Sequence, residues 1–596
     1  MTSHALQVQS IDQHTEIVMA TQADPSAREH QAHGPRRVVI IGGVAGGMSA
    51  ATRLRRLDES AHITVIERSG HVSFANCGLP YHVGGVIQQR SALLLQTPVS
   101  LAARFGIEVR VLHDAIHIDR DRQRVVVRSL ETGAEEALPY DALVLSPGAR
   151  PVRPPIPGIE RALSLRNVED TDAMITALDG AKTAVVIGGG FIGMEMVENL
   201  VHRGVATALV EATSQVMAPL DPEMVEPVHT RIRGAGVSLH LDASVVAIDE
   251  AGVTLSTGER LPADVVIAAI GVRPETSLAA DAGLTIGPRG GIAIDESFRT
   301  SDSSIYAVGD AVEKRDGLDG SETLVPLANT ANRQGRFVAD IIAGMPGTDH
   351  GVLGTAIVGV FGLQVAATGW NEKRLRAAGR PYRAIHTHPA SHAGYFPGAQ
   401  GMSLKLLVDP DTDRILGAQG VGRDGVDKRI DVIATAMTGG LTASALADLE
   451  LAYAPQFGSA KDPVNMLGYI ADNLRTGVTD TIQWYELEDA MAAGETLVDV
   501  RSRGEHSHGS IPGSILIPVD ELRDRLDEIP AGPVTVHCAV GMRAHTALRI
   551  LRQSGWEDVH NLDGGYTTWA AGTSGQQHRQ PRGTGSAHRR PAEVAP

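Results

Sequence analysis

Cysteine is scarce in this sequence, since the 596 residues contain only Cys77 and Cys538. So few thiols exclude a scaffold of several disulfides and are typical of the reducing cytoplasm, where we expect this protein. Long apolar runs are also missing, because no uninterrupted apolar segment approaches the length that spans a bilayer. Residues Met1–Met19 hold no Lys or Arg and no sustained apolar run. We therefore expect neither a membrane segment nor a secretory signal.

Basic residues are outnumbered, with 53 Lys and Arg against 70 Asp and Glu, which gives a net charge of −17. This balance argues against broad binding to nucleic acid or to an anionic membrane, although a local basic pocket for a phosphorylated ligand is compatible with it. Aromatic residues make up only 4%, whereas glycine is abundant at 65 residues. Proteins of the α/β class that bind nucleotides place glycine at strand-to-helix turns.

Two segments of the chain share one order of apolar and glycine-rich stretches. In the first, RRVVIIGG (residues 36–43) predicts a buried strand, MSAATRLRRL (48–57) has helical spacing, and HITVIER (62–68) predicts the next strand. The same order returns in TAVVIGGG (183–190), FIGMEMVENLVHRG (191–204) and ATALVEA (206–212). A strand–helix–strand unit is the core of a dinucleotide-binding fold, so the sequence predicts two such folds.

The first unit carries a glycine loop that suits a pyrophosphate. Glycines at the turn let the phosphates approach the N-terminus of the following helix. Val44 replaces the middle glycine of the usual G-x-G-x-x-G pattern, but Glu67 ends the next strand, where an acid can bind a ribose 2′-hydroxyl. We assign to this site Gly42, Gly43, Ala45, Gly46, Gly47 and Glu67.

The second unit matches the full glycine pattern through Gly188, Gly190 and Gly193. Glu211 ends its second strand. A carboxylate at that place repels the 2′-phosphate of NADPH and accepts hydrogen bonds from the free hydroxyls of NADH. The sequence therefore favours NADH over NADPH here.

Cys77 lies in SFANCGLPY (residues 73–81), between polar and helix-starting neighbours. Asn76 is a poor core residue, and Pro80 suits an early helix position, near which a thiolate is stabilised. No second cysteine lies in this part of the chain, so the sulfur that reacts with Cys77 must come from elsewhere. A mixed disulfide with a small thiol, a sulfenic acid, and exchange with Cys538 all satisfy this condition.

Strand and helix signals return near the end of the chain, in TLVDVRS (496–502), VTVHCAVG (534–541), RAHTALRIL (543–551) and DVHNLDGG (558–565). Cys538 follows a strand and opens a helix. A loop of this kind can point backbone N–H groups at the sulfur, which lowers the thiolate pKa and stabilises a persulfide. Arg543 adds a fixed positive charge.

Three further motifs resemble the signatures of the flavin-dependent pyridine nucleotide-disulfide oxidoreductases: LSPG (145–148), GVRP (271–274) and IYAVGD (305–310). The resemblance covers about residues 36–475. It implies FAD on the first loop, with Asp310 at the ribityl chain, and NADH on the second, with Glu195 beside the nicotinamide and flavin. Within these motifs, Ser146, Gly148 and Gly309 are also assigned to cofactor binding.

SFANCGLPY is similar to the active segment of coenzyme A-disulfide reductases, and more specifically of those fused to a rhodanese domain, some of which reduce persulfides with NADH. The pattern C-x-x-G-x-R at Cys538, with DVR upstream and NLDGG downstream, resembles a single rhodanese domain over about residues 481–572. The resemblance implies that Cys77 is catalytic through a mixed disulfide with coenzyme A. It also implies that Cys538, assisted by Arg543, carries sulfane sulfur.

The same resemblance implies a homodimer. HAGY and YAPQFGSAKDPVN are similar to motifs whose tyrosines, here Tyr395 and Tyr453, reach the active cysteine of the partner subunit, although Gln456 and Gly458 replace the usual Pro and Ser. Their hydroxyls can donate to a thiolate or to departing sulfur. Candidates for holding the pantetheine and phosphates of coenzyme A are Ser73, Asn76, Arg56, Asn329 and Arg333.

The expected fold is α/β, with two Rossmann-like domains for FAD and NADH, an α/β dimerisation domain and a rhodanese-like α/β domain. The predicted boundaries are a disordered arm (1–35), the FAD domain (36–150 and 271–325), the NADH domain (151–270), the dimerisation domain (326–476), the rhodanese domain (481–572) and a disordered tail (573–596). We assign no metal site.

The expected activity is NADH-dependent reduction of small-molecule persulfides or disulfides. An NADH oxidase or peroxidase that cycles Cys77 through a sulfenic acid is the nearest alternative. A sulfur carrier or redox sensor with little turnover is another. The sequence does not rank coenzyme A persulfide against coenzyme A disulfide, glutathione persulfide or polysulfide.

Overall fold

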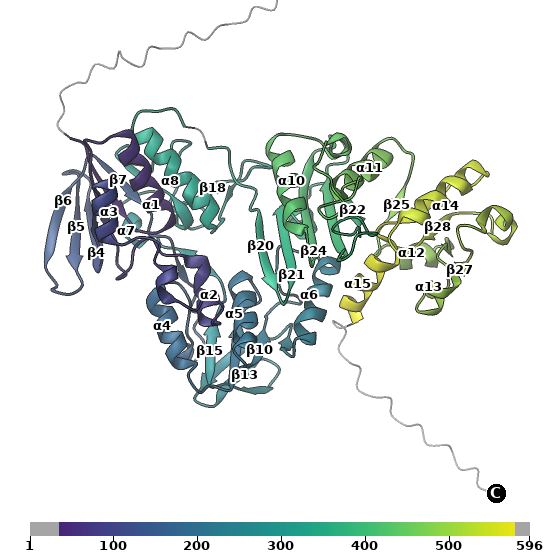
Figure 1. The fold of residues 1–596 in the computed structure, drawn as a ribbon, viewed down its shortest axis with the longest axis horizontal. Coiled ribbons are helices and arrows are strands. Elements are labelled where there is room, and N and C mark those ends of the chain that lie inside the picture. Colours follow the sequence, from purple (N-terminus) through teal and green to yellow (C-terminus); the bar gives the residue numbers. More distant parts are fainter. Residues whose placement is uncertain (1–34, 348, 578–596) are drawn as a thin grey trace, which may run out of the picture.

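The structure is a computed structural model that describes residues 35–347 and 349–577. Except for Pro35, the predicted arm lies outside the described residues. Figure 1 shows two lobes at the left, one above the other, a central sheet, and a last lobe at the right. No helix in these ranges is long and apolar enough to cross a membrane. The α/β architecture agrees with the predicted fold class.

The first lobe is built on a parallel sheet in the order β17-β7-β1-β2-β3. The apolar run VVII (Val38–Ile41) lies in its central strand and is buried on both faces. Helix α8 packs against α1 on one face, and an antiparallel sheet β4-β5-β6 covers the other. The bounds are β1 (Arg37–Ile41), α1 (Ala45–Leu57), β2 (His62–Ile66), α3 (Pro98–Phe105), β3 (Glu108–Arg110), β4 (His113–Asp119), β5 (Arg124–Ser129), β6 (Glu135–Pro139), β7 (Ala142–Leu145), α7 (Ser277–Asp281), β17 (Ile305–Ala307) and α8 (Ala328–Ile342).

The second lobe repeats this plan with the parallel order β11-β10-β9-β15. The paired strands β8 and β16 join it to the first lobe. Its bounds are β8 (Ala149–Pro151), α4 (Val168–Ala177), β9 (Thr183–Ile187), α5 (Phe191–His202), β10 (Ala206–Val210), α6 (Pro222–Gly234), β11 (Ser238–His240), β12 (Val245–Asp249), β13 (Gly252–Leu255), β14 (Arg260–Pro262), β15 (Val265–Ala268) and β16 (Val272–Pro274). Both predicted strand–helix–strand units are thus confirmed.

The central sheet is antiparallel, in the order β20-β21-β24-β23-β22, and two long helices pack on it. Its bounds are β20 (Ala356–Val360), β21 (Leu363–Gly369), α9 (Glu372–Ala377), β22 (Arg383–Thr387), β23 (Met402–Val408), β24 (Ile415–Gly422), α10 (Val426–Thr438) and α11 (Pro463–Arg475). Shorter elements of the chain are α2 (Leu79–Val83), β18 (Lys314–Arg315) and β19 (Glu322–Thr323).

The predicted start of the third domain at residue 326 is too early. Val338, Ala339 and Ile342 of α8 are buried in the core of the first lobe, beside α1. This helix therefore belongs to the first lobe by its packing. This packing could not be predicted from the sequence, because the whole second lobe lies between α1 and α8 in the chain.

The last lobe holds a parallel sheet in the order β25-β29-β28-β26-β27. Its bounds are β25 (Thr481–Ile482), α12 (Leu487–Ala492), β26 (Thr496–Asp499), α13 (Arg503–Ser507), β27 (Ile515–Leu516), β28 (Val534–His537), α14 (Met542–Gln553), β29 (Val559–Leu562) and α15 (Gly565–Gln577). In Figure 1, α15 lies beside α6, and the two helices are in contact.

The predicted disordered tail begins too early, because α15 continues to Gln577. Gly572 packs against the indole of Trp484, and the hydroxyl of Thr573 donates to the carbonyl of Trp569. Small residues make this stretch look featureless in the sequence, although here they allow close packing. The rest of the predicted tail lies outside the described residues.

Two glycines of α15 make a matched test of this packing. A methyl group at Gly572 would lie 2.4 Å from the Trp484 ring, whereas one at Gly575 meets only Glu226 Oε2 at 3.7 Å. We expect Gly572→Ala to lower the free energy of unfolding by about 1–3 kcal/mol through overpacking. Gly575→Ala should leave it unchanged or raise it by up to about 1 kcal/mol, since Ala favours helix. Thermal unfolding measures the stability of both variants. A more stable Gly572→Ala than Gly575→Ala would contradict this packing.

Candidate functional site

The two glycine loops have the same hydrogen-bond geometry. The amide of Gly43 donates to Glu67 Oε2, and that of Gly189 donates to Glu211 Oε2, each over 2.7 Å. Each acid thus fixes the loop of its own lobe as well as ending the neighbouring strand. At the third glycine, a methyl group on Gly193 would lie 1.9 Å from the carbonyl oxygen of Gly188, so only glycine lets the helix approach the strand.

A cavity of about 530 Å³ lies over the first loop. Predicted residues that line it are Gly42, Ala45, Gly46, Glu67, Asn76, Ser146, Gly148, Gly309 and Asp310. Asp310 Oδ1 is buried without a hydrogen-bond partner, which fits a ligand hydroxyl at that place. Gly148 has open space around it, so a bound group can approach the backbone there. The donor set suits a dinucleotide such as FAD.

Two arginines in this cavity escaped the sequence reasoning. Arg68 and Arg166 line it, and the guanidinium of Arg166 donates to the carbonyl of Pro147 over 3.0 Å. They supply the cations that a pyrophosphate attracts. Arg68 directly follows the Glu67 strand, which is a usable signal. Arg166 is isolated in the sequence and offers none.

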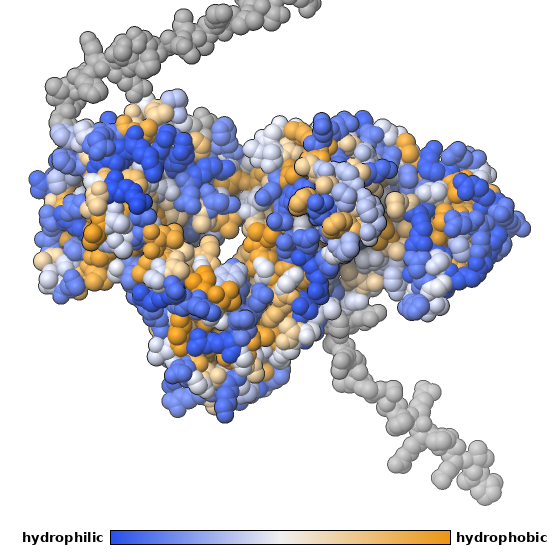
Figure 2. All heavy atoms as spheres, in the orientation of Figure 1, coloured by the Kyte–Doolittle hydropathy of each residue, from blue (hydrophilic) through white to orange (hydrophobic). Residues whose placement is uncertain are grey.

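A larger cavity of about 1130 Å³ joins the second loop to Cys77. Predicted residues that line it are Ala45, Asn76, Cys77, Gly188, Gly190, Glu195, Glu211, Asp310 and Asn329. Figure 2 shows apolar side chains gathered around the hollow between the lobes, over α2 and β20. One thiol therefore shares its cavity with residues of both glycine loops and with Asp310.

Cys77 lies in a single helical turn (Asn76–Gly78) directly before the five-residue helix α2, and it is exposed. The sequence predicted that a helix start would favour its thiolate. The structure differs, because burial and then the carboxylates of Glu195 and Asp310 raise the pKa of Cys77. Desolvation of the sulfur in the cavity, reinforced by two acids, outweighs the effect of one short helix on the pKa of Cys77.

Glu195, on α5, lies in this cavity close to Tyr81, which the sequence reasoning did not select. Burial raises the pKa of Glu195 to about 7. The hydroxyl of Tyr81 donates to Glu195 Oε1 over 3.5 Å, and burial, followed by Glu195, raises the pKa of Tyr81 to about 12. Tyr81 closes the SFANCGLPY segment, so its place four residues after Cys77 was the available signal.

The two motif tyrosines lie together but away from Cys77 of their own chain. Their hydroxyls are 2.9 Å apart, and Tyr395 is 76% and Tyr453 48% exposed. Neither lines the cavity of Cys77. Phe457, which follows Tyr453 in the same motif, is also exposed. The two tyrosines therefore lie on the surface, outside the cavity that holds Cys77 of their own chain.

Three of the five residues predicted to hold coenzyme A lie outside both cavities. Arg56 lies over the ring of Phe105, and Arg333 donates to the carbonyl of Gly351 over 2.6 Å. Ser73 has a left-handed backbone with φ of 50°. Asn76 and Asn329 do line the cavity of Cys77.

Cys538 is buried at the start of the loop between β28 and α14. The amide of Gly541 donates to its Sγ over 3.1 Å, as the sequence predicted for such a loop. Arg543 pairs with both oxygens of Glu505, at 2.8 and 2.6 Å, and this pairing lowers the pKa of Glu505 to about 2. The charge of Arg543 is therefore shared between the loop and a carboxylate.

The two cysteines lie far apart within one chain. Figure 1 places α2, which follows Cys77, and α14, which follows the Cys538 loop, on opposite sides of the central sheet. Cys538 is absent from the lining of the cavity that holds Cys77. Within one chain, sulfur cannot pass directly between them in this arrangement.

Comparison with known proteins places the chain in a class. A model described as "Pyridine nucleotide-disulphide oxidoreductase" matches residues 36–335, and the dimerisation domain of the same family matches residues 355–463. A rhodanese-like domain matches residues 483–572. The chain belongs to the pyridine nucleotide-disulphide oxidoreductase family, and the predicted resemblance is confirmed.

Individual relatives match either the reductase part or most of this chain. The chain is 33% identical to coenzyme A disulfide reductase from Staphylococcus haemolyticus over 74% of this chain and 100% of that protein. It is 48% identical to the structure of reduced Bacillus anthracis CoADR-RHD, with a TM-score of 0.90 over 91% of this chain and 99% of that one. It is 40% identical to an NAD-dependent persulfide reductase from A. fulgidus, with a TM-score of 0.84 over 89% and 100%.

The second glycine loop yields a matched pair of variants. Gly190 has open space around it and an extended backbone, so Gly190→Ala should fold normally while its methyl group occupies the path of the pyrophosphate. We expect it to weaken binding of the pyridine nucleotide by about 1–3 kcal/mol. Gly193→Ala should instead lower the free energy of unfolding by a similar amount, about 1–3 kcal/mol or more. Nucleotide titration and thermal unfolding separate the two effects, and equal behaviour of both variants would contradict this reading.

The raised pKa of Glu195 predicts a pH-dependent cost. Between its ordinary value of 4.5 and about 7 the native state binds more protons at this group than the unfolded state. Its contribution to stability therefore falls as the pH rises through that window. We expect Glu195→Gln to raise the melting temperature at about pH 8 more than at about pH 5. Glu160→Gln, at an exposed acid, is the control, and an identical pH response of both variants would contradict the prediction.

Proposed function

We propose that the protein is an NADH-dependent flavoenzyme that reduces the sulfur–sulfur bond of coenzyme A persulfide or coenzyme A disulfide through Cys77, with sulfane sulfur supplied by Cys538. One observation carries this proposal: a lone thiol shares a cavity with two nucleotide-binding loops. With no neighbouring cysteine, the sulfur partner of Cys77 must arrive as a ligand. The named activities of the coenzyme A disulfide reductase and persulfide reductase relatives support it.

FAD is assigned to the cavity of the first lobe and NADH to the second loop. Glu67 and Glu211 would each accept a hydrogen bond from a ribose, and Asp310 would use its unpartnered oxygen toward FAD. Glu211 opposes the 2′-phosphate of NADPH, which favours NADH. When bound, FAD supplies the route for two electrons from NADH to the sulfur of Cys77. Glu195, which lines the same cavity as the second loop, would contact the nicotinamide.

The proposed sulfur chemistry has two steps at this chain's own thiols. A coenzyme A thiolate attacks the outer sulfur of the Cys538 persulfide, so that coenzyme A persulfide forms and Cys538 leaves as a thiolate. The Cys77 thiolate then attacks the sulfur next to coenzyme A, forming Cys77–S–S–CoA and releasing hydrosulfide. Two electrons from NADH return Cys77 and coenzyme A to thiolates. Arg543 and the Gly541 amide stabilise the charge on Cys538.

We further propose a homodimer in which the partner completes the site. Exposed Tyr395 and Tyr453 would donate to the sulfur leaving Cys77 of the other subunit. The pantetheine and phosphates of coenzyme A would be held by Asn76, Asn329, Ser73, Arg56 and Arg333. Two free cysteines support a cytoplasmic location.

An NADH oxidase is the second candidate, because the chain is 26% identical to a water-forming NADH oxidase from Lactobacillus brevis, with a TM-score of 0.71 over 74% of this chain and 99% of that one. In that chemistry Cys77 would cycle through a sulfenic acid. The matched part leaves about a quarter of this chain uncovered. The buried Cys538 loop favours sulfur transfer instead.

Anaerobic NADH oxidation tests the proposal directly. With coenzyme A persulfide as substrate, we expect stoichiometric sulfide release that Cys77→Ser abolishes and Cys538→Ser preserves. With thiosulfate as donor and coenzyme A present, both variants should fail, because loading then requires Cys538. Full persulfide reduction by Cys77→Ser would disprove the role of Cys77. NADH oxidation that is absent under these anaerobic conditions and begins only when oxygen is admitted would favour the oxidase.

A further inference from the structure

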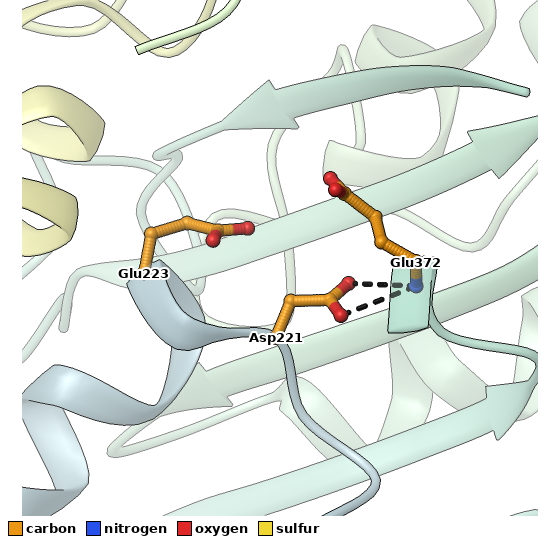
Figure 3. A group of neighbouring side chains, drawn as sticks. All are labelled: Asp221, Glu223 and Glu372. Carbon is orange, nitrogen blue, oxygen red and sulfur yellow. Dashed lines mark hydrogen bonds between the residues drawn. The ribbon is translucent and has the colours of Figure 1, made fainter. Parts of the chain in front are cut away.

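A buried group of charges connects the last lobe to the reductase. Asp221, Glu223 and Glu372 point toward one another in Figure 3, with Asp221 and Glu223 at the start of α6 and Glu372 at the start of α9. Three clustered carboxylates could hold a metal ion. Here the positive charge is the protein's own, because Lys405 Nζ lies 2.9 Å from Asp221 and 2.6 Å from Glu372 and also pairs with Glu223.

His386, on β22, continues this group toward the last lobe. Its Nε2 contacts Glu223 Oε1 at 3.1 Å, and its Nδ1 contacts Asp563 Oδ2 at 2.6 Å. All three side chains are at least 95% buried. Burial alone would lower the pKa of His386, but Asp563 and Glu223 outweigh it and raise the pKa to about 9. A cationic imidazole between two carboxylates therefore joins the second lobe, the central sheet and the last lobe.

Asp563 leads directly to the Cys538 loop. It lies immediately before Gly564 and Gly565, and the next amide, of Tyr566, donates to the carbonyl of Cys538 over 2.8 Å. A methyl group on Gly565 would lie 2.5 Å from that carbonyl, so the two backbones are in contact. The group that docks the lobe thus also holds the backbone of the sulfur-carrying residue.

A second contact runs beside the first. His388 Nε2 lies 2.8 Å from the hydroxyl of Thr568, in the first turn of α15, and its Nδ1 lies 2.9 Å from Ser403 of the central sheet. Burial, followed by the charge of His386, lowers the pKa of His388 to about 4, so it is a neutral hydrogen-bonding group. Both histidines lie at the C-terminal end of β22, and both contact the start of α15 or the residues just before it.

We propose that His386 and Asp563 are positioning residues that fix the Cys538 loop against the reductase body, so that sulfur leaving Cys538 starts from one defined place. This inference rests on the proposed function. Helices α2 and α14, which follow Cys77 and the Cys538 loop, lie on opposite sides of the central sheet in Figure 1. A fixed starting place therefore matters for delivery to a carrier thiol or to a partner subunit. Neither histidine nor aspartate touches a reacting sulfur.

The first test measures position without activity. We compare hydrogen exchange of the backbone amides in residues 538–543 and 563–568 of the full chain with and without His386→Asn and Asp563→Asn. Each variant leaves a buried carboxylate or imidazole without its partner, so exchange should accelerate in both segments. Thr387→Val is the matched control, since its side chain points to the opposite face of the same strand. Unchanged exchange in both variants would overturn the inference.

The second test measures delivery. In His386→Asn and in Asp563→Asn, the rate of sulfide release from thiosulfate, with substoichiometric coenzyme A and with NADH, should fall about tenfold or more. Such a loss is expected when a reacting group is misplaced. Reduction of added coenzyme A disulfide should stay at the wild-type rate, because it does not use Cys538. A coupled rate equal to wild type would overturn the inference.

The double variant separates a specific pair from general damage. Two asparagines can donate to each other, so His386→Asn with Asp563→Asn should lose less than the product of the single losses. Simple multiplication of the losses would contradict pairing. If the wild type releases no sulfide in the coupled assay, the proposed function fails, and the exchange experiment alone then decides the positioning inference.

Discussion

The arrangement of this molecule depends on a buried ammonium group that must be paired. Lys405 is fully buried, and its three carboxylate partners come from two different lobes. Removing Lys405 from such a site would leave three buried carboxylates without their shared cation, which is far more costly than forming the group is favourable. The central sheet and the second lobe therefore tolerate little change in relative position. His386 extends the same constraint to the last lobe.

The elements that position the cofactors could be predicted because their signals are local. A glycine turn, the helix after it and the acid that ends the next strand lie within one short stretch of chain, and the amide contacts of Gly43 and Gly189 follow from that order. The Cys538 loop was foreseen for the same reason. The lone Cys77 could also be identified, since its importance follows from counting cysteines.

Features that depend on distant residues could not be predicted. Glu223 and Lys405 are 182 residues apart, and neither has an unusual neighbour in the sequence. Helix α8 returns to the first lobe after the whole second lobe, so its membership is visible only in its packing against α1. The end of α15 was missed because Gly572, which looks like a helix breaker, is required by the indole of Trp484. The electrostatics of Cys77 likewise depend on Glu195 and Asp310 from other segments.

The two thiols occupy opposite environments. Cys77 is exposed beside two carboxylates, whereas Cys538 is buried beneath an amide donor and near a guanidinium. The first environment disfavours a free thiolate, and the second accommodates the negative charge of a persulfide. A division of labour between reduction and sulfur carriage follows from these surroundings.

The separation of the two cysteines within one polypeptide also sets a stoichiometry. One carrier loop is made for every reductase centre, and the docked lobe keeps the two centres in one molecule at a fixed separation. Under the proposed function, a persulfide released from Cys538 meets a reductase centre before it is diluted into the surrounding thiol pool. Fusion thereby limits the escape of a reactive intermediate, a kinetic advantage that neither domain has alone.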